Sequence, residues 1–96
     1  PMPADTDPAD LEWIAPRRVE QPLGTFTEPC PFGGSEISVP KAYIYCLRSG
    51  PGDMFGPFAE RAKISDDWVY REIDASHSPN ITAPTRLLEL LEELGV

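Results

Sequence analysis

Two runs of β-forming residues, joined by a loop and a helix-like stretch, constrain this fold more than any other feature. The first run spans residues 42–47 and the second spans residues 68–74. Between them, apolar residues recur at the spacing of one helix face: Phe55, Phe58, Ala59 and Ala62. A strand–helix–strand unit of this length is what a crossover between two parallel strands requires. The sequence therefore predicts an α/β fold with adjacent parallel strands.

Helices on both faces of such a sheet are expected, because parallel strands are normally buried on both sides. The continuous apolar character of residues 42–47 agrees with this arrangement. A final helix is predicted from about residue 82 to Gly95, which is a natural helix stop. Its apolar stripe is predicted from four leucines: Leu87, Leu88, Leu91 and Leu94.

The first forty residues predict little regular structure. Twelve prolines occur in 96 residues, and most precede residue 58. A short helix is expected to begin at Pro8, with Asp7 as its N-cap, and to end at Pro16. Residues 17–40 are predicted to be irregular, with an extended connector at residues 21–26.

Composition excludes several classes of function. A net charge of −8 argues against nucleic acid or an anionic membrane as the main partner. No apolar run approaches the roughly 20 residues that span a bilayer, and no signal peptide is visible, so a cytoplasmic location is expected. Cys30 and Cys46 do not form a disulfide framework. The lone histidine and the spacing of the acidic residues argue against a metal site, and no cofactor is expected.

The single histidine, His77, lies in a polar loop between the second predicted strand and the final helix. Open α/β sheets place their chemistry at the carboxyl edge of the strands, and imidazole exchanges protons near neutral pH. If the strands are parallel neighbours, the loop at 48–53 leaves the same edge and brings Asp53 close to His77. A carboxylate there can fix the imidazole tautomer, as in a Ser…Asp…His triad. A helix cap or a plain loop aspartate remains an equal alternative for Asp53.

From Pro40 to Leu94 the chain resembles the C-terminal portion of an α/β-hydrolase. It is most similar to the small esterases related to plant methyl esterases and hydroxynitrile lyases. The resemblance is carried by these motifs: Val39-Pro40-Lys41-Ala42-Tyr43-Ile44-Tyr45-Cys46, Phe58-Ala59, Trp68, Glu72-Ile73-Asp74-Ala75-Ser76-His77-Ser78-Pro79, and Ala83-Pro84 with the leucines that follow. It covers over half of the chain.

This resemblance implies that His77 is the catalytic histidine. Family members place the acid directly after the strand that ends here near Leu47, where this chain has Arg48-Ser49-Gly50-Pro51-Gly52. Asp53 is displaced from that position by a few residues, and some hydrolases carry the acid after an earlier strand. The chain has no Gly-x-Ser-x-Gly motif, so the nucleophile and the oxyanion donors are expected outside it.

We therefore expect residues 1–39 to be a cap-exit segment and connector, and residues 40–96 to be a β-α-β-α part of a hydrolase core that is incomplete as a domain. The chain begins at Pro1 rather than Met, and we expect it to be a fragment or a processed piece. The expected partners are a small-molecule ester and the N-terminal remainder of the fold. Two other functions stay open: cyanohydrin or carbon–carbon bond cleavage with the same histidine as base, and a non-catalytic piece that associates with another chain.

Overall fold

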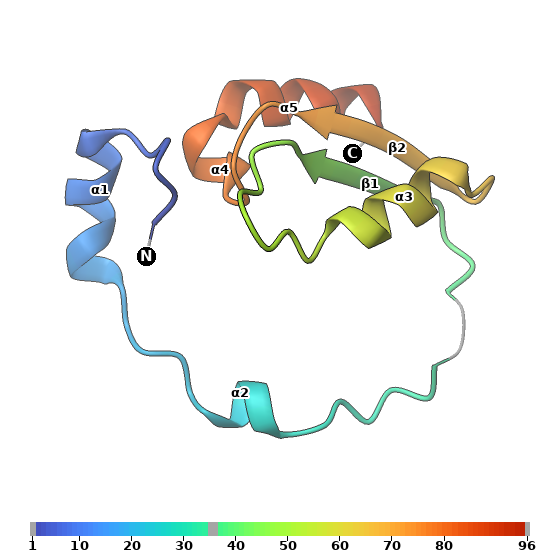
Figure 1. Ribbon diagram of the computed structural model, residues 1–96, viewed down its shortest axis with the longest axis horizontal. Coiled ribbons are helices and arrows are strands. Elements are labelled where there is room, and N and C mark those ends of the chain that lie inside the picture. The colour runs from blue at the N-terminus through green and yellow to red at the C-terminus, as the bar shows by residue number, and fades with distance from the viewer. Residues whose placement is uncertain (1, 35–36, 96) are drawn as a thin grey trace.

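The computed structural model describes residues 2–34 and 37–95. Four residues lie outside the described ones: 1, 35, 36 and 96. The first three belong to the predicted segment 1–39, and the last belongs to the predicted segment 40–96. The elements follow in this order: α1 (Pro8–Ile14), a 3₁₀ turn (Ala15–Arg17), α2 (Gly24–Thr27), β1 (Lys41–Cys46), α3 (Gly56–Ile64), β2 (Trp68–Ile73), α4 (Pro79–Thr82) and α5 (Pro84–Glu93). Figure 1 shows the strands and α3 to α5 gathered together, while the segment through α2 sweeps away from them.

The two strands form a parallel pair, as the sequence predicts. Their register runs from Lys41 opposite Trp68 to Cys46 opposite Ile73. The ladder continues past the strands, because the Leu47 amide donates to the Ile73 carbonyl and the Arg48 amide donates to the Ala75 carbonyl. The described chain is therefore a mixed α/β structure, and the carboxyl ends of its two strands lie at the same edge of the sheet.

Helices α3 and α5 cover opposite faces of this pair. Alternation along the strands sends Tyr43 and Tyr45 toward α3, where the Tyr43 hydroxyl donates to the Phe55 carbonyl over 3.3 Å. The other face carries a small core of Ile73, Ala75 and Leu90, against which Ile44, Cys46, Ala83 and Leu87 pack. Because neither outer strand edge is paired among the described residues, the β1 side chains are only partly buried, and Ala42 is exposed. The expectation that both faces of this strand are fully buried is therefore not met here.

The leucine stripe of α5 differs from the predicted one. Leu90 is 1% exposed and belongs to the core, whereas Leu88 is 56% exposed. Leu87, Leu90, Leu91 and Leu94 follow the i, i+3, i+4, i+7 pattern of a single face, and Leu88 lies about 100° around the helix from Leu87. Including Leu88 and omitting Leu90 was wrong, because the preceding turn fixes which face meets the sheet.

The N-terminal helix begins where the sequence predicts it. The Asp7 carboxylate caps α1 by accepting from the Ala9 amide over 2.9 Å, and Pro8 occupies its first turn. The prediction of an extended connector at residues 21–26 is wrong, since α2 begins at Gly24. Its single turn is closed by backbone bonds to the Leu23 and Gly24 carbonyls.

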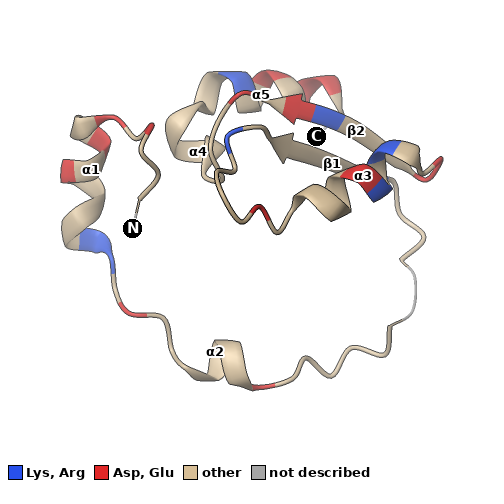
Figure 2. Cartoon of the chain, viewed as in Figure 1, with Lys and Arg blue, Asp and Glu red and all other residues tan. Residues whose placement is uncertain are grey.

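Acidic and basic side chains are interspersed over the described residues. Figure 2 shows acidic residues along α1 and α5, with basic residues scattered among acidic ones on β2 and α3. Within residues 2–34 and 37–95, no helix combines the length and apolar character needed to cross a membrane.

Candidate functional site

His77 lies where β2 has ended and α4 has not yet begun. Its loop is anchored by the buried residues Ile73 and Ala75 on the core side and by Pro79 at the first position of α4. The His77 side chain is exposed, while Ser76 beside it is only 7% exposed. The imidazole is thus presented at the carboxyl edge of the parallel pair by a loop whose base is fixed.

The loop after β1 lies beside this histidine. A small hollow of about 60 Å³ is lined by His77 together with Tyr45, Cys46, Ser49 and Phe55, among other residues. The Ser49 hydroxyl donates to the Cys46 carbonyl over 2.7 Å, which occupies its proton. Burial raises the pKa of the Cys46 thiol, so this group is a weak nucleophile.

Asp53 also lies in this loop and has two partners. One carboxylate oxygen accepts from the Phe55 amide over 2.9 Å, and the other accepts a short hydrogen bond from the Tyr45 hydroxyl. The Tyr45 hydroxyl is the main cause that lowers the pKa of Asp53, and Asp53 in turn raises the pKa of Tyr45. No hydrogen bond joins Asp53 to His77 among the described residues. Its role as triad acid stays a prediction.

The Phe55 ring stacks on the imidazole. The two rings are stacked, with centroids 4.3 Å apart and an interplanar angle of 17°. The sequence pattern placed Phe55 on an apolar face of α3 and gave no sign of this contact. A stacking partner across two loops has no local sequence signal.

A second carboxylate reaches the histidine loop from the N-terminal segment. Asp5 accepts from the Ser76 amide over 3.1 Å. The Ser76 hydroxyl lies beside this carboxylate and is the main cause that lowers the pKa of Asp5. The hydroxyl and the carboxylate do not meet in hydrogen-bond geometry. The Ser76 hydroxyl and the second Asp5 oxygen are therefore buried without a hydrogen-bond partner among the described residues. An open depression of about 700 Å³ lies here, lined in part by Asp5, Arg48, Ser49 and His77.

Arg48 forms a two-pronged ion pair with Asp74, at 2.8 and 3.1 Å, across the ends of the two strands. Arg48 is the main cause that lowers the pKa of Asp74. Both side chains are more than half exposed, so the pair contributes little to stability in water. It fixes the relative position of the loop after β1 and the loop that carries His77.

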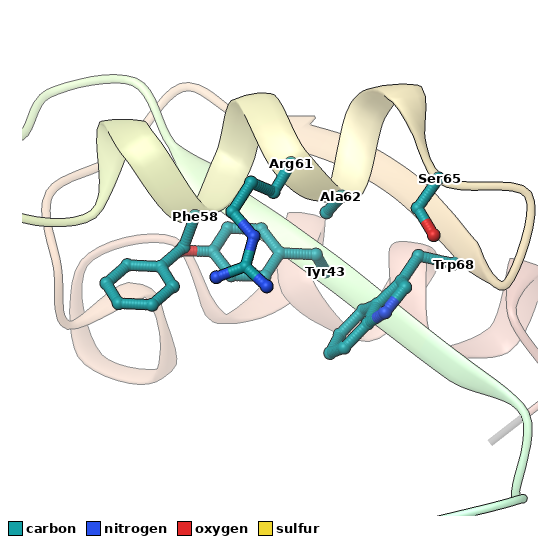
Figure 3. A pocket seen from close by; sticks show the side chains of 6 residues that line it. All are labelled: Tyr43, Phe58, Arg61, Ala62, Ser65 and Trp68. Carbon is teal, nitrogen blue, oxygen red and sulfur yellow. The ribbon is translucent and has the colours of Figure 1, made fainter. Parts of the chain in front are cut away.

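Another pocket lies against α3, on the face of β1 that carries Tyr43. It has a volume of about 190 Å³ and is lined by Tyr43, Phe58, Arg61, Ala62, Ser65 and Trp68. Figure 3 shows Arg61 reaching from α3 toward the Tyr43 ring, between Phe58 and Trp68 in this view. The Tyr43 and Trp68 rings meet edge to face at 6.3 Å. This pocket contains neither His77 nor a carboxylate, and it shares Tyr43 with the hollow beside His77.

In the described part of the chain, His, Cys, Asp and Glu side chains form no group that could hold a metal ion. Comparisons with protein-family models, with curated proteins and with solved structures found no match for this chain.

Proposed function

We propose that this chain is the C-terminal part of a serine carboxylester hydrolase of the α/β-hydrolase fold, in which His77 is the general base. One observation carries the proposal. The parallel register of β1 and β2 brings the loop after β1 and the loop of His77 to the same edge. An antiparallel hairpin would have separated them. The resemblance of residues 40–94 to hydrolases adds the expected role of each residue.

In this proposal a serine outside the chain attacks the ester carbonyl. His77 takes the serine proton as the new carbon–oxygen bond forms, and it returns a proton to the leaving alcohol as the acyl-enzyme forms. Water then repeats the cycle and releases the acid. Exposure of the imidazole suits this role, because a nucleophile from another part of the fold can approach it. Asp53, in the loop after β1, is the acidic candidate that the sequence indicated, and Asp5 is a second candidate that the sequence did not indicate.

A second proposal is association without catalysis. Large apolar side chains are exposed along the first forty residues and on the sheet, including Leu23, Phe26, Phe32 and Val69. Apolar surface of this kind marks contact with another protein surface. Such contact is also what the hydrolase proposal requires of the rest of the fold, so activity decides between the two.

The test is ester hydrolysis by the assembly that contains the nucleophile. Replacing His77 by Ala should lower kcat/KM for p-nitrophenyl acetate by roughly 10⁴-fold or more, because loss of a triad member is that severe. Asn80→Ala is a matched control, since Asn80 is exposed and lies three positions further along the chain. Near-normal turnover by the His77 variant would leave association as the function. Cleavage of a cyanohydrin in place of the ester would indicate a lyase with the same base.

A further inference from the structure

The conformation of His77 depends on a ring that the hydrolase scheme does not use. Phe55 stacks on the imidazole at 4.3 Å between centroids, nearly parallel to it. The His77 side chain makes no hydrogen bond within the described part of the chain, and it is exposed. The face of Phe55 is therefore the contact that limits the rotation of His77 about its side-chain torsions.

Phe55 is itself held at both ends of its backbone. Its amide donates to Asp53, and its carbonyl accepts from the Tyr43 hydroxyl. The second Asp53 oxygen takes the Tyr45 hydroxyl, so one carboxylate ties the loop to the side chains of β1. Gly56 leaves room for this arrangement, because a Cβ at that position would lie 2.9 Å from the Asp53 carboxylate.

From these contacts we infer that Asp53 and Phe55 are positioning residues for His77. Asp53 acts through Phe55: it fixes the backbone that carries the aromatic ring, and the ring fixes the imidazole. The catalytic meaning of this arrangement rests on the proposed function, whereas the arrangement itself does not. It assigns Asp53 a role different from direct hydrogen bonding to the imidazole.

The two roles of Asp53 predict opposite results for one pair of substitutions. A triad acid needs its negative charge, and replacing it by the amide costs about 10⁴-fold in turnover. A positioning residue needs an oxygen that accepts from the Phe55 amide and a second group that bonds the Tyr45 hydroxyl. Asn supplies both without a charge, because its oxygen accepts from the amide and its NH2 group donates to the hydroxyl oxygen. Asp53→Asn should therefore preserve the position of His77, whereas Asp53→Ala should release it.

NMR of the full chain tests the arrangement directly, because His77 is the only histidine and its ring protons are assigned without ambiguity. The π electrons of a stacked ring shield protons above its face, so the His77 ring protons should resonate upfield of their free-peptide positions. Phe55→Leu should remove this shift, and Asp53→Ala should reduce it. Asp53→Asn should keep it. Phe58→Leu is the matched control, since Phe58 lies in α3, three positions after Phe55, and lines a pocket without His77.

Turnover of the assembly that contains the nucleophile gives an independent readout. Asp53→Ala and Phe55→Leu should each lower kcat/KM by about 100-fold, the cost of misplacing a reacting group by about 1 Å, and Asp53→Asn should stay within a few-fold of wild type. An unshifted His77 in the wild-type chain would overturn the inference, and so would equal losses in the two Asp53 variants. If the shifts follow the expected pattern but His77→Ala retains turnover, the positioning stands and the proposed function fails.

Discussion

The two halves of this molecule use similar residues with different results. In residues 41–95, two strands and the helices on both faces bury Ile73, Ala75 and Leu90 almost completely. In residues 2–34 and 37–40, apolar side chains stay in water: Val19 is 91% exposed and Phe26 is 73% exposed. Figure 1 shows the N-terminal part as an open sweep beside the strands and the helices α3 to α5.

Layering explains the difference better than hydrophobicity does. A buried apolar side chain needs a second element to cover it, and α3 and α5 provide that cover for the strands. The helices of the N-terminal part, α1 and α2, have seven and four residues and are joined by irregular chain, so they do not cover each other's apolar side chains. Stability should therefore reside in residues 41–95.

Limited proteolysis should give the largest contrast between the regions. Trypsin should cut after Arg17 or Arg18, which are exposed next to the first helix, roughly 100-fold faster than after Arg61 in α3 or Arg71 in β2. Timed digestion followed by mass spectrometry measures the order of cleavage. Simultaneous cleavage at all four sites would show that residues 41–95 have no independent stability.

Matched truncations should show the next largest contrast. Leu90→Ala should reduce the free energy of unfolding by about 2–5 kcal/mol, because it empties a buried site. Phe26→Ala should change it by about 0.5 kcal/mol or less, because the ring is already in water. Urea unfolding followed by circular dichroism measures both. Equal losses would mean that Phe26 is covered in solution.

A substitution at the N-cap of α1 should have a smaller effect, confined to that helix. Asp7→Ala removes the carboxylate that accepts from the Ala9 amide, and it should destabilise α1 by about 1 kcal/mol. Carbon chemical shifts of Asp10 to Ile14 should move toward coil values, while the amide exchange of β1 and β2 should not change. Faster amide exchange in β1 or β2 would show that the stability of the strands depends on α1.

Acid should weaken residues 41–95 in a manner that depends on the strand-end ion pair. Arg48 lowers the folded-state pKa of Asp74 below the ordinary value of 3.8. The unfolded chain therefore binds the proton more readily, so the stabilisation is present above about pH 4 and is lost as pH falls through the lowered pKa. Arg48→Gln should flatten the fall in stability below pH 4. An unchanged pH profile, measured by unfolding at several pH values, would show that the pair is inert.

Local and periodic features of this fold were predictable from the sequence. Asp7 and Pro8 mark the start of α1, and the β-rich runs mark the strands within a residue of their ends. The single-turn helices at Gly24–Thr27 and Pro79–Thr82 were missed, because a turn of four residues has no hydrophobic period. Leu88 was misplaced because stripe position depends on how the preceding turn orients the helix.

For the candidate site, only its location at the carboxyl edge of the strands was predictable from the sequence. The parallel-strand rule indicated that His77 would lie beside the loop after β1, and the structure has both there. The stack on Phe55 and the Asp5 contact with Ser76 could not be predicted, because they join side chains far apart in sequence with no local pattern. The partners of Asp53 show the same limit, since Tyr45 and Phe55 are near in sequence but were identified only as apolar positions.

The hydrogen bond from the Ser76 amide to Asp5 closes a long ring of chain, because 71 positions separate the two residues. With the strands already formed, the free part of the ring is the segment from Asp5 to β1, and its closure costs on the order of 3 kcal/mol of chain entropy. One hydrogen bond to a solvent-accessible carboxylate offsets no more than a cost of this order. These terms nearly balance, so the N-terminal segment should attach to the histidine loop and detach from it while the sheet stays intact. The surroundings of His77 would then alternate between a state with Asp5 beside the loop and a state in which water takes its place.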